Sequence, residues 1–84
     1  MKKLFDEQAF ADYLYWHTQD LKTLNKIHRL LQSIERNGAM VGEGKPERLK
    51  YGMGYSRRID ETNRLVYDIE DDTLIIKSCR GHYE

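Results

Sequence analysis

The spacing of apolar residues changes once along the chain, at Gly38, and this change constrains the fold most. Before Gly38, two segments carry apolar side chains three or four residues apart, which is the spacing of one helical face. Asp6 and Asp20 precede these segments as N-caps, and glycine at 38 can end the second helix in the left-handed conformation. Two amphipathic helices are therefore predicted, with apolar faces formed by Phe10, Tyr13, Leu14 and His17 in the first and by Leu21, Leu24, Ile27, Leu31 and Ile34 in the second.

After Gly38 the sequence is typical of short strands. A glycine-rich loop with the only proline, Pro46, leads to Glu47 at the start of a strand. Short polar turns separate the segments that follow, and residues 3–5 form one more strand candidate. The pattern predicts one α+β domain over residues 1–84, with two N-terminal helices packed on one face of a mainly antiparallel sheet of about four to five strands. The expected later strands are 48–51, 55–59, 64–69 and 73–79.

The composition is that of an ordinary globular protein. Of the 84 residues, 39% are apolar and 33% charged, and no apolar run approaches the roughly 20 residues that span a bilayer. The opening MKKLFDEQ becomes acidic before an apolar run develops, so no signal peptide is expected and a cytoplasmic location is favoured. Cys79 is the only cysteine, and its apolar surroundings in the sequence favour a buried side chain over a nucleophile.

The charged residues are unevenly distributed although the formal net charge is zero. Residues 36–58 contain six basic side chains and only two acidic ones, whereas residues 68–72 are almost wholly acidic. A zero net charge argues against binding nucleic acid through bulk electrostatics alone. An unevenly charged solvated surface explains this distribution as well as a binding face does.

Alternation along the strand at 64–69 places an arginine on the uncovered face of the sheet. Leu65, Tyr67 and Ile69 share one face, which we assign to the helices, so Arg64 points to the other. We call this other face the open face.

The turn after this strand predicts which residues lie near Arg64. A two-residue turn at 71–72 would pair apolar residues across the hairpin and bring Cys79 opposite Arg64. His82 would then lie three residues beyond the partner of Arg64, within about 10 Å along the strand.

The turn before the strand predicts a second arginine on the open face. A three-residue loop at 61–63 would pair Asp60 with Arg64 and Arg58 with Val66. Arg58 would then share the face of Arg64. Two guanidinium groups beside a histidine suit an anionic ligand that carries a phosphate.

These residue types could together cleave RNA. Attack of a 2′-hydroxyl on the phosphodiester needs a base, a cation for the nonbridging oxygens and an acid for the leaving 5′-oxygen, but no metal or other cofactor. Glu47 could be the base, Arg64 with Arg58 the cation and His82 the acid, while Tyr83 could stack on a nucleobase. Spacing alone leaves the alternative that each is an ordinary surface residue.

Five sequence blocks resemble the YoeB/Txe family of bacterial toxins, within the RelE/ParE superfamily. These blocks are DYLYW, GKPERLK, YSRRI, NRLVY and CRGHY, and they span nearly the whole chain in the same order. The resemblance implies a RelE-like microbial RNase fold and a toxin that cuts mRNA in the A site of the 70S ribosome, leaving a 2′,3′-cyclic phosphate and a 5′-hydroxyl. It further implies a YefM-type antitoxin as partner and a possible homodimer. Neither a cofactor nor a membrane partner is expected.

The resemblance also implies roles for individual residues. The general base falls on Glu47, the transition-state arginine on Arg64, and the general acid on His82, with the adjacent aromatic residue at Tyr83. Contacts with substrate or ribosomal RNA are predicted for Lys50, Arg57 and Arg58.

Two other function classes remain open. One is a ParE-like toxin that inhibits DNA gyrase by binding, because a shared fold does not decide function. The other is a plain interaction domain whose C-terminal segment docks in a partner. The combination of Glu47, Arg64 and His82 distinguishes the nuclease, since neither alternative has a chemical need for all three.

Overall fold

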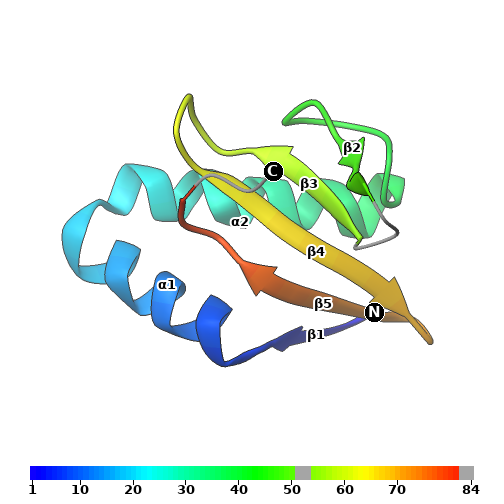
Figure 1. Ribbon diagram of the computed structural model, residues 1–84, viewed down its shortest axis with the longest axis horizontal. Helices are drawn as coiled ribbons and strands as arrows, with labels where there is room; N and C mark the ends of the chain where they lie inside the picture. Colours follow the sequence, from blue (N-terminus) through cyan, green and yellow to red (C-terminus); the bar gives the residue numbers. More distant parts are fainter. Residues whose placement is uncertain (51–53, 82–84) are drawn as a thin grey trace.

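Two helices pack on one face of a five-stranded mixed sheet in the computed structural model, which describes residues 1–50 and 54–81 (Figure 1). The strand order is β1-β5-β4-β3-β2, with β1 parallel to β5 and the other pairs antiparallel. This arrangement confirms the predicted α+β class. None of the described helices is both long and apolar enough to cross a membrane. The elements are β1 Lys2–Phe5, α1 Glu7–Gln19, α2 Leu21–Asn37, β2 Glu47–Arg48, β3 Tyr55–Arg58, β4 Arg64–Glu70 and β5 Thr73–Ser78.

Both helices begin and α2 ends at the residues that the sequence indicates. The Asp6 carboxylate accepts a hydrogen bond from the backbone N–H of Ala9 at 3.0 Å, so it satisfies one of the free donors at the start of α1. Asp20 caps α2 in the same way. Gly38 has a φ of 93°, and its N–H donates to the carbonyl of Ile34, as expected for a glycine after the last turn.

The buried face of α1 differs from the predicted one. Phe10 and Leu14 are 53% and 48% exposed, whereas Ala9, Asp12 and Trp16 are buried. The indole N–H of Trp16 and the carboxylate of Asp12 explain why α1 is rotated relative to the prediction, because both bind the backbone just after β5. Trp16 Nε1 donates to the carbonyl of Cys79 at 2.8 Å, and Asp12 Oδ2 accepts from the N–H of Cys79 at 3.0 Å. Apolar spacing alone could not reveal a helix face that contains a buried carboxylate.

The predicted face of α2 is correct except at its first residue. Leu24, Ile27, Leu31 and Ile34 are buried against the sheet, and Leu30 joins them. Leu21 is exposed. This helix therefore supplies most of the helical half of the core.

Loss of the Asp12 carboxylate should destabilise the fold measurably. We expect Asp12→Ala to lower the free energy of unfolding by about 1–3 kcal/mol, because it leaves the buried N–H of Cys79 without an acceptor. Urea denaturation followed by circular dichroism measures this change. Asp12→Asn keeps an acceptor oxygen and should lose less, so an equal loss in both variants would show that the hydrogen bond is not the cause.

The hairpin between β4 and β5 has the predicted turn. Asp71 and Asp72 have φ values of 48° and 59°, as a two-residue type I′ turn requires. Apolar side chains face each other beyond the turn, since Ile69 pairs with Leu74 and Tyr67 with Ile76.

A β-bulge then changes the predicted partner of Arg64. The register shifts between Val66 and Tyr67, so that Val66 pairs with Ser78. The extra residue on one strand moves Cys79 away from the position opposite Arg64. The backbone N–H of Arg64 instead donates to the carbonyl of Gly81 at 3.0 Å.

The loop between β3 and β4 is five residues long, not three. Arg58 pairs directly with Arg64, and residues 59–63 connect the two strands. The Asp60 carboxylate organises this loop by accepting hydrogen bonds from the backbone N–H groups of Thr62 and Asn63. The predicted pairing of Arg58 with Val66 is therefore wrong by two residues. Because this shift is even, Arg58 still lies on the face of Arg64.

Candidate active site

A carboxylate and a guanidinium group meet on the open face. Glu47 of β2 pairs with Ser56 of β3, and Arg64 of β4 donates from Nη1 to Ser56 Oγ at 3.2 Å. Arg64 Nη2 lies 3.9 Å from Glu47 Oε1. The Arg64 side chain is only 15% exposed, whereas that of Glu47 is 59% exposed. The site thus has a fixed cation, Arg64, beside an accessible carboxylate, Glu47.

Arg58 adds a second positive charge to this site. It pairs directly across the strands with Arg64 and is exposed. Like charges at directly opposed positions repel each other, so an anion between or beside them would stabilise the pair. The arrangement fits a phosphate ligand.

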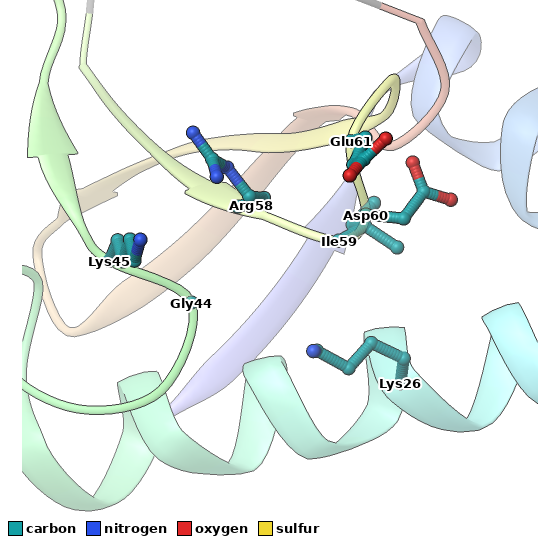
Figure 2. A pocket seen from close by; sticks show the side chains of 7 residues that line it. All are labelled: Lys26, Gly44, Lys45, Arg58, Ile59, Asp60 and Glu61. Carbon is teal, nitrogen blue, oxygen red and sulfur yellow. The ribbon is translucent and has the colours of Figure 1, made fainter.

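A cavity of about 390 Å³ lies next to Arg58 (Figure 2). Lys26 extends into it from α2 on one side, and Arg58 borders it from β3 on the other. Three of its side chains are basic and two are acidic, so it continues the charged surface without being uniformly positive. Its lining comprises Lys26, Gly44, Lys45, Arg58, Ile59, Asp60 and Glu61.

Arg57 is in the interior and does not reach the open face. It is 0% exposed, and it lies opposite Leu65 on the helix-covered side of the sheet. Each of its N–H groups has an acceptor within the protein. The predicted contact of Arg57 with RNA does not fit this position. The signal was available in the sequence, because strand alternation puts adjacent residues 57 and 58 on opposite faces.

The other predicted site residues lie partly outside the described chain. Lys50 is exposed two residues after β2. His82 and Tyr83 lie outside the described residues. The described chain ends at Gly81, whose carbonyl binds the N–H of Arg64.

Asn63 and Ser56 contribute to the site, and sequence reasoning missed both. The side-chain oxygen of Asn63 accepts from the N–H of Gly81 at 2.8 Å, while its amide donates to Asp60. Asn63 therefore links the β3–β4 loop to the C-terminal segment. Ser56 holds the guanidinium of Arg64. Alternation puts Ser56 on the face of Arg58, but only the register reveals its contact with Arg64.

A family of bacterial toxins matches this chain over almost its whole length. The family described as the YoeB-like toxin of bacterial type II toxin-antitoxin systems matches residues 5–83. Toxin YoeB of Escherichia coli strain K12 is 44% identical over 85 residues, which cover 99% of this chain and 100% of that protein. The chain belongs to the YoeB-like toxin family.

Solved structures agree with this membership in the YoeB-like family. A YoeB dimer from Staphylococcus aureus is similar at a TM-score of 0.93 and 49% identity, covering 99% of this chain and 98% of that one. The YoeB-YefM toxin-antitoxin heterotetramer from the same organism is similar at 0.92 and 48% identity, with the same coverage. YafQ from E. coli shares the fold at a TM-score of 0.76 and 15% identity, covering 96% of this chain and 92% of that one.

The single thiol of this YoeB-like toxin is not part of the site. Cys79 is fully buried, as predicted. Burial, with a smaller contribution from the charge of Asp12, raises the pKa of the Cys79 thiol to about 12. The thiol is therefore neutral and inaccessible at neutral pH.

The buried thiol gives a prediction for chemical labelling and for alkaline stability. Native Cys79 should resist a disulfide-exchange reagent at pH 8 and react at once in denaturant. Because the thiol has a higher pKa folded than unfolded, the unfolded state loses its proton first, and the free energy of unfolding should fall as pH rises from about 9 towards 12. Labelling of the native protein as fast as the denatured one would contradict this placement.

Proposed function

We propose that this YoeB-like toxin is a ribosome-dependent mRNA endoribonuclease. It cuts mRNA in the A site of the 70S ribosome by general acid-base catalysis, without a metal, and so inhibits translation. The observation that carries this proposal is the pair formed by Glu47 and Arg64 on the open face, 3.9 Å apart, with Arg58 directly across from Arg64. A base and two phosphate-binding cations on adjacent strands are two of the three parts that the reaction needs.

Each residue has a defined step. Glu47 takes the proton of the 2′-hydroxyl, and the 2′-oxygen attacks the adjacent phosphorus. Arg64 and Arg58 stabilise the negative charge that accumulates on the nonbridging oxygens. His82 donates a proton to the 5′-oxygen as its bond to phosphorus breaks. The products are a 2′,3′-cyclic phosphate and a 5′-hydroxyl.

The ion pair between Glu47 and Arg64 does not prevent substrate binding. Because Glu47 is largely exposed and its oxygen lies 3.9 Å from Arg64, the pair contributes at most about 1 kcal/mol. A phosphate can therefore replace the carboxylate as the partner of Arg64 at little cost. Glu47 is then free to accept a proton.

The position of Gly81 supports the roles of the two following residues. Gly81 binds the backbone of Arg64 and the side chain of Asn63, so the described chain ends beside the phosphate-binding arginine. We assign His82 as the general acid and Tyr83 as the aromatic residue that stacks on a nucleobase. Lys50, exposed near the end of β2, would contact RNA.

An antitoxin and a second copy of the chain are the proposed protein partners. The relatives from S. aureus were solved as a YoeB-YefM heterotetramer and as a YoeB dimer. We infer that this chain binds a YefM-type antitoxin, which either occupies the basic open face or displaces the C-terminal segment. Light scattering of the toxin alone and with the antitoxin tests both assemblies. A monomer under both conditions would contradict them.

Mapping of mRNA ends tests the nuclease directly. The purified toxin is added to a reconstituted translation reaction, and the 5′ ends of a reporter mRNA are mapped by primer extension with and without ribosomes. Cuts that need ribosomes and lie at a fixed offset from stalled codons are expected. Intact mRNA in both reactions, together with inhibition of DNA gyrase, would overturn the proposal in favour of a ParE-like binder.

A further inference from the structure

We propose that buried Arg57 is a positioning residue that holds the loop carrying Glu47, and so sets the place of the general base opposite Arg64. The inference rests on the proposed nuclease function. It assigns to Arg57 a role in the rate of cleavage and none in the affinity for RNA.

All five N–H donors of the Arg57 guanidinium are used. Nε donates to the hydroxyl of Tyr67 at 3.0 Å, and one Nη1 hydrogen goes to Ser33 Oγ at 3.0 Å. The remaining three bind backbone carbonyls between α2 and β2, all at 2.8 Å. These carbonyls belong to Gly38, Val41 and Glu43. One side chain thus binds the C-cap of α2 at one point and the loop that follows it at two.

Residues 39–46, the Glu47 loop, have no helix or strand to hold them. Besides Arg57, the loop is attached by the hydroxyl of Tyr67, which donates to Ala39, and by the N–H of Arg58, which donates to the carbonyl of Gly44. Glu43 is also attached to α2: its N–H donates to Ser33 Oγ, and its carboxylate forms ion pairs with Lys26 and Arg29. Tyr67 also accepts from Arg57, so two of the main attachments form one network. Loss of that network would remove the hydrogen bonds to the carbonyls of Ala39, Val41 and Glu43.

The loop backbone packs directly against Arg57. A Cβ on Gly44 would lie 3.0 Å from the Cβ of Arg57, and a Cβ on Gly42 would collide with the hydroxyl of Ser33. Both glycines have positive φ values, 92° and 118°. The loop follows the shape of the guanidinium and its partners closely.

Arginine is the only side chain that can make this arrangement. Among the described residues, Arg57 forms no ion pair, so its buried charge is balanced by carbonyl and hydroxyl dipoles. Lysine has three donors on one nitrogen and cannot reach five acceptors that surround a planar group. A buried cation of this kind needs a full set of partners to be stable.

The loop can affect the position of Glu47 because the strand that carries Glu47 is short. The loop ends at Pro46, directly before Glu47. Strand β2 has two residues and, within the described part of the chain, pairs only with β3. A small displacement of the loop would move the Glu47 carboxylate relative to Arg64, and displacement of a catalytic group by about 1 Å can cost about 100-fold in rate.

Tyr67→Phe tests the network with the smallest change in packing. It removes the hydroxyl that joins Arg57 to Ala39 and keeps the ring. Single-turnover cleavage at saturating ribosomes should fall by about 10-fold, while the affinity for ribosomes stays unchanged. Tyr55→Phe is the matched control: its ring stacks on that of Tyr67 in the same layer, and it should cleave normally.

Repeating the substitutions in the Glu47→Gln variant distinguishes a role in positioning Glu47 from a general loss of structure. In Glu47→Gln, where the base is already absent, Tyr67→Phe should cause almost no further loss of rate. Arg57→Lys should behave in the same way, and Ser33→Ala carries the test if Arg57→Lys does not fold. Thermal unfolding confirms that every variant is folded at the assay temperature.

The outcomes distinguish this inference from the proposed function. Wild-type toxin that does not cleave mRNA on ribosomes would overturn both. Cleavage by the wild type, with Tyr67→Phe losing the same factor in both backgrounds or losing ribosome affinity instead, would overturn only the role of Arg57. The role of Arg57 is supported if Tyr67→Phe lowers the cleavage rate in the wild-type protein but not in the Glu47→Gln variant.

Discussion

Replacement of Arg64 by alanine is expected to slow mRNA cleavage on the ribosome by about 10²–10³-fold. Arg64 is largely covered and held by Ser56, so it presents a fixed cation to the phosphate with little freedom left to lose. Single-turnover cleavage at saturating ribosomes measures the effect. Arg64→Lys keeps the charge but loses the two-pronged geometry, and should recover only part of the rate.

A matched arginine controls for the loss of positive charge. Arg36 is exposed in the last turn of α2, away from the open face, and Arg36→Ala should cleave at the wild-type rate. If Arg64→Ala and Arg36→Ala lost the same small factor, Arg64 would be an ordinary surface charge.

Replacement of Glu47 by glutamine is expected to lower the cleavage rate by about 100-fold or more, with ribosome binding unchanged. Glutamine keeps the shape of the side chain and an acceptor oxygen, but it cannot take up the proton of the 2′-hydroxyl. His82→Gln should have an effect of similar size through loss of the general acid.

The cleavage rate and the affinity for ribosomes of Glu47→Gln must be measured separately to assign its role. Glu70→Gln changes an exposed carboxylate at the far end of β4 and should behave as wild type. Equal losses of binding and cleavage in Glu47→Gln would contradict its role as base. The same test on His82→Gln would distinguish an acid from a docking residue.

The sequence predicts those parts of the fold that depend on local chemistry. Asp6, Asp20 and Gly38 mark helix ends because a cap needs particular atoms at a particular residue. The turn at 71–72 follows from its length and residue types. The shared face of Arg58 and Arg64 follows from alternation, which survives an even shift in register.

Features that depend on contacts between distant segments could not be predicted in this way. The bulge between Val66 and Tyr67 shifts the register of β4 against β5. The buried face of α1 is set by hydrogen bonds that Asp12 and Trp16 form with the backbone of Cys79. Sequence distance hides the hydrogen bonds of α1, since the bonded residues are more than 60 positions apart.

In the candidate site, too, some features follow from the local sequence and others depend on contacts between segments. Strand alternation finds Arg64, but the meeting of Arg64 with Glu47 depends on a loop that has no periodic pattern. That loop is hydrogen-bonded by Arg57, which strand alternation places on the face opposite to Arg58 but whose partners the sequence does not reveal. Its burial is stabilised by five acceptors from three parts of the chain, and no local rule identifies them.

Analysis of the chemical ends of the cleaved mRNA tests the central claim most directly. Ribosome-bound mRNA is cut by wild-type toxin, and the 3′ and 5′ ends of the fragments are characterised by their reactivity with a kinase and a cyclic phosphodiesterase. Transfer of the 2′-hydroxyl proton to Glu47 predicts 2′,3′-cyclic phosphate and 5′-hydroxyl ends, absent with Glu47→Gln. Fragments with 5′-phosphate and free 3′-hydroxyl ends, or unchanged cleavage by Glu47→Gln, would contradict the account.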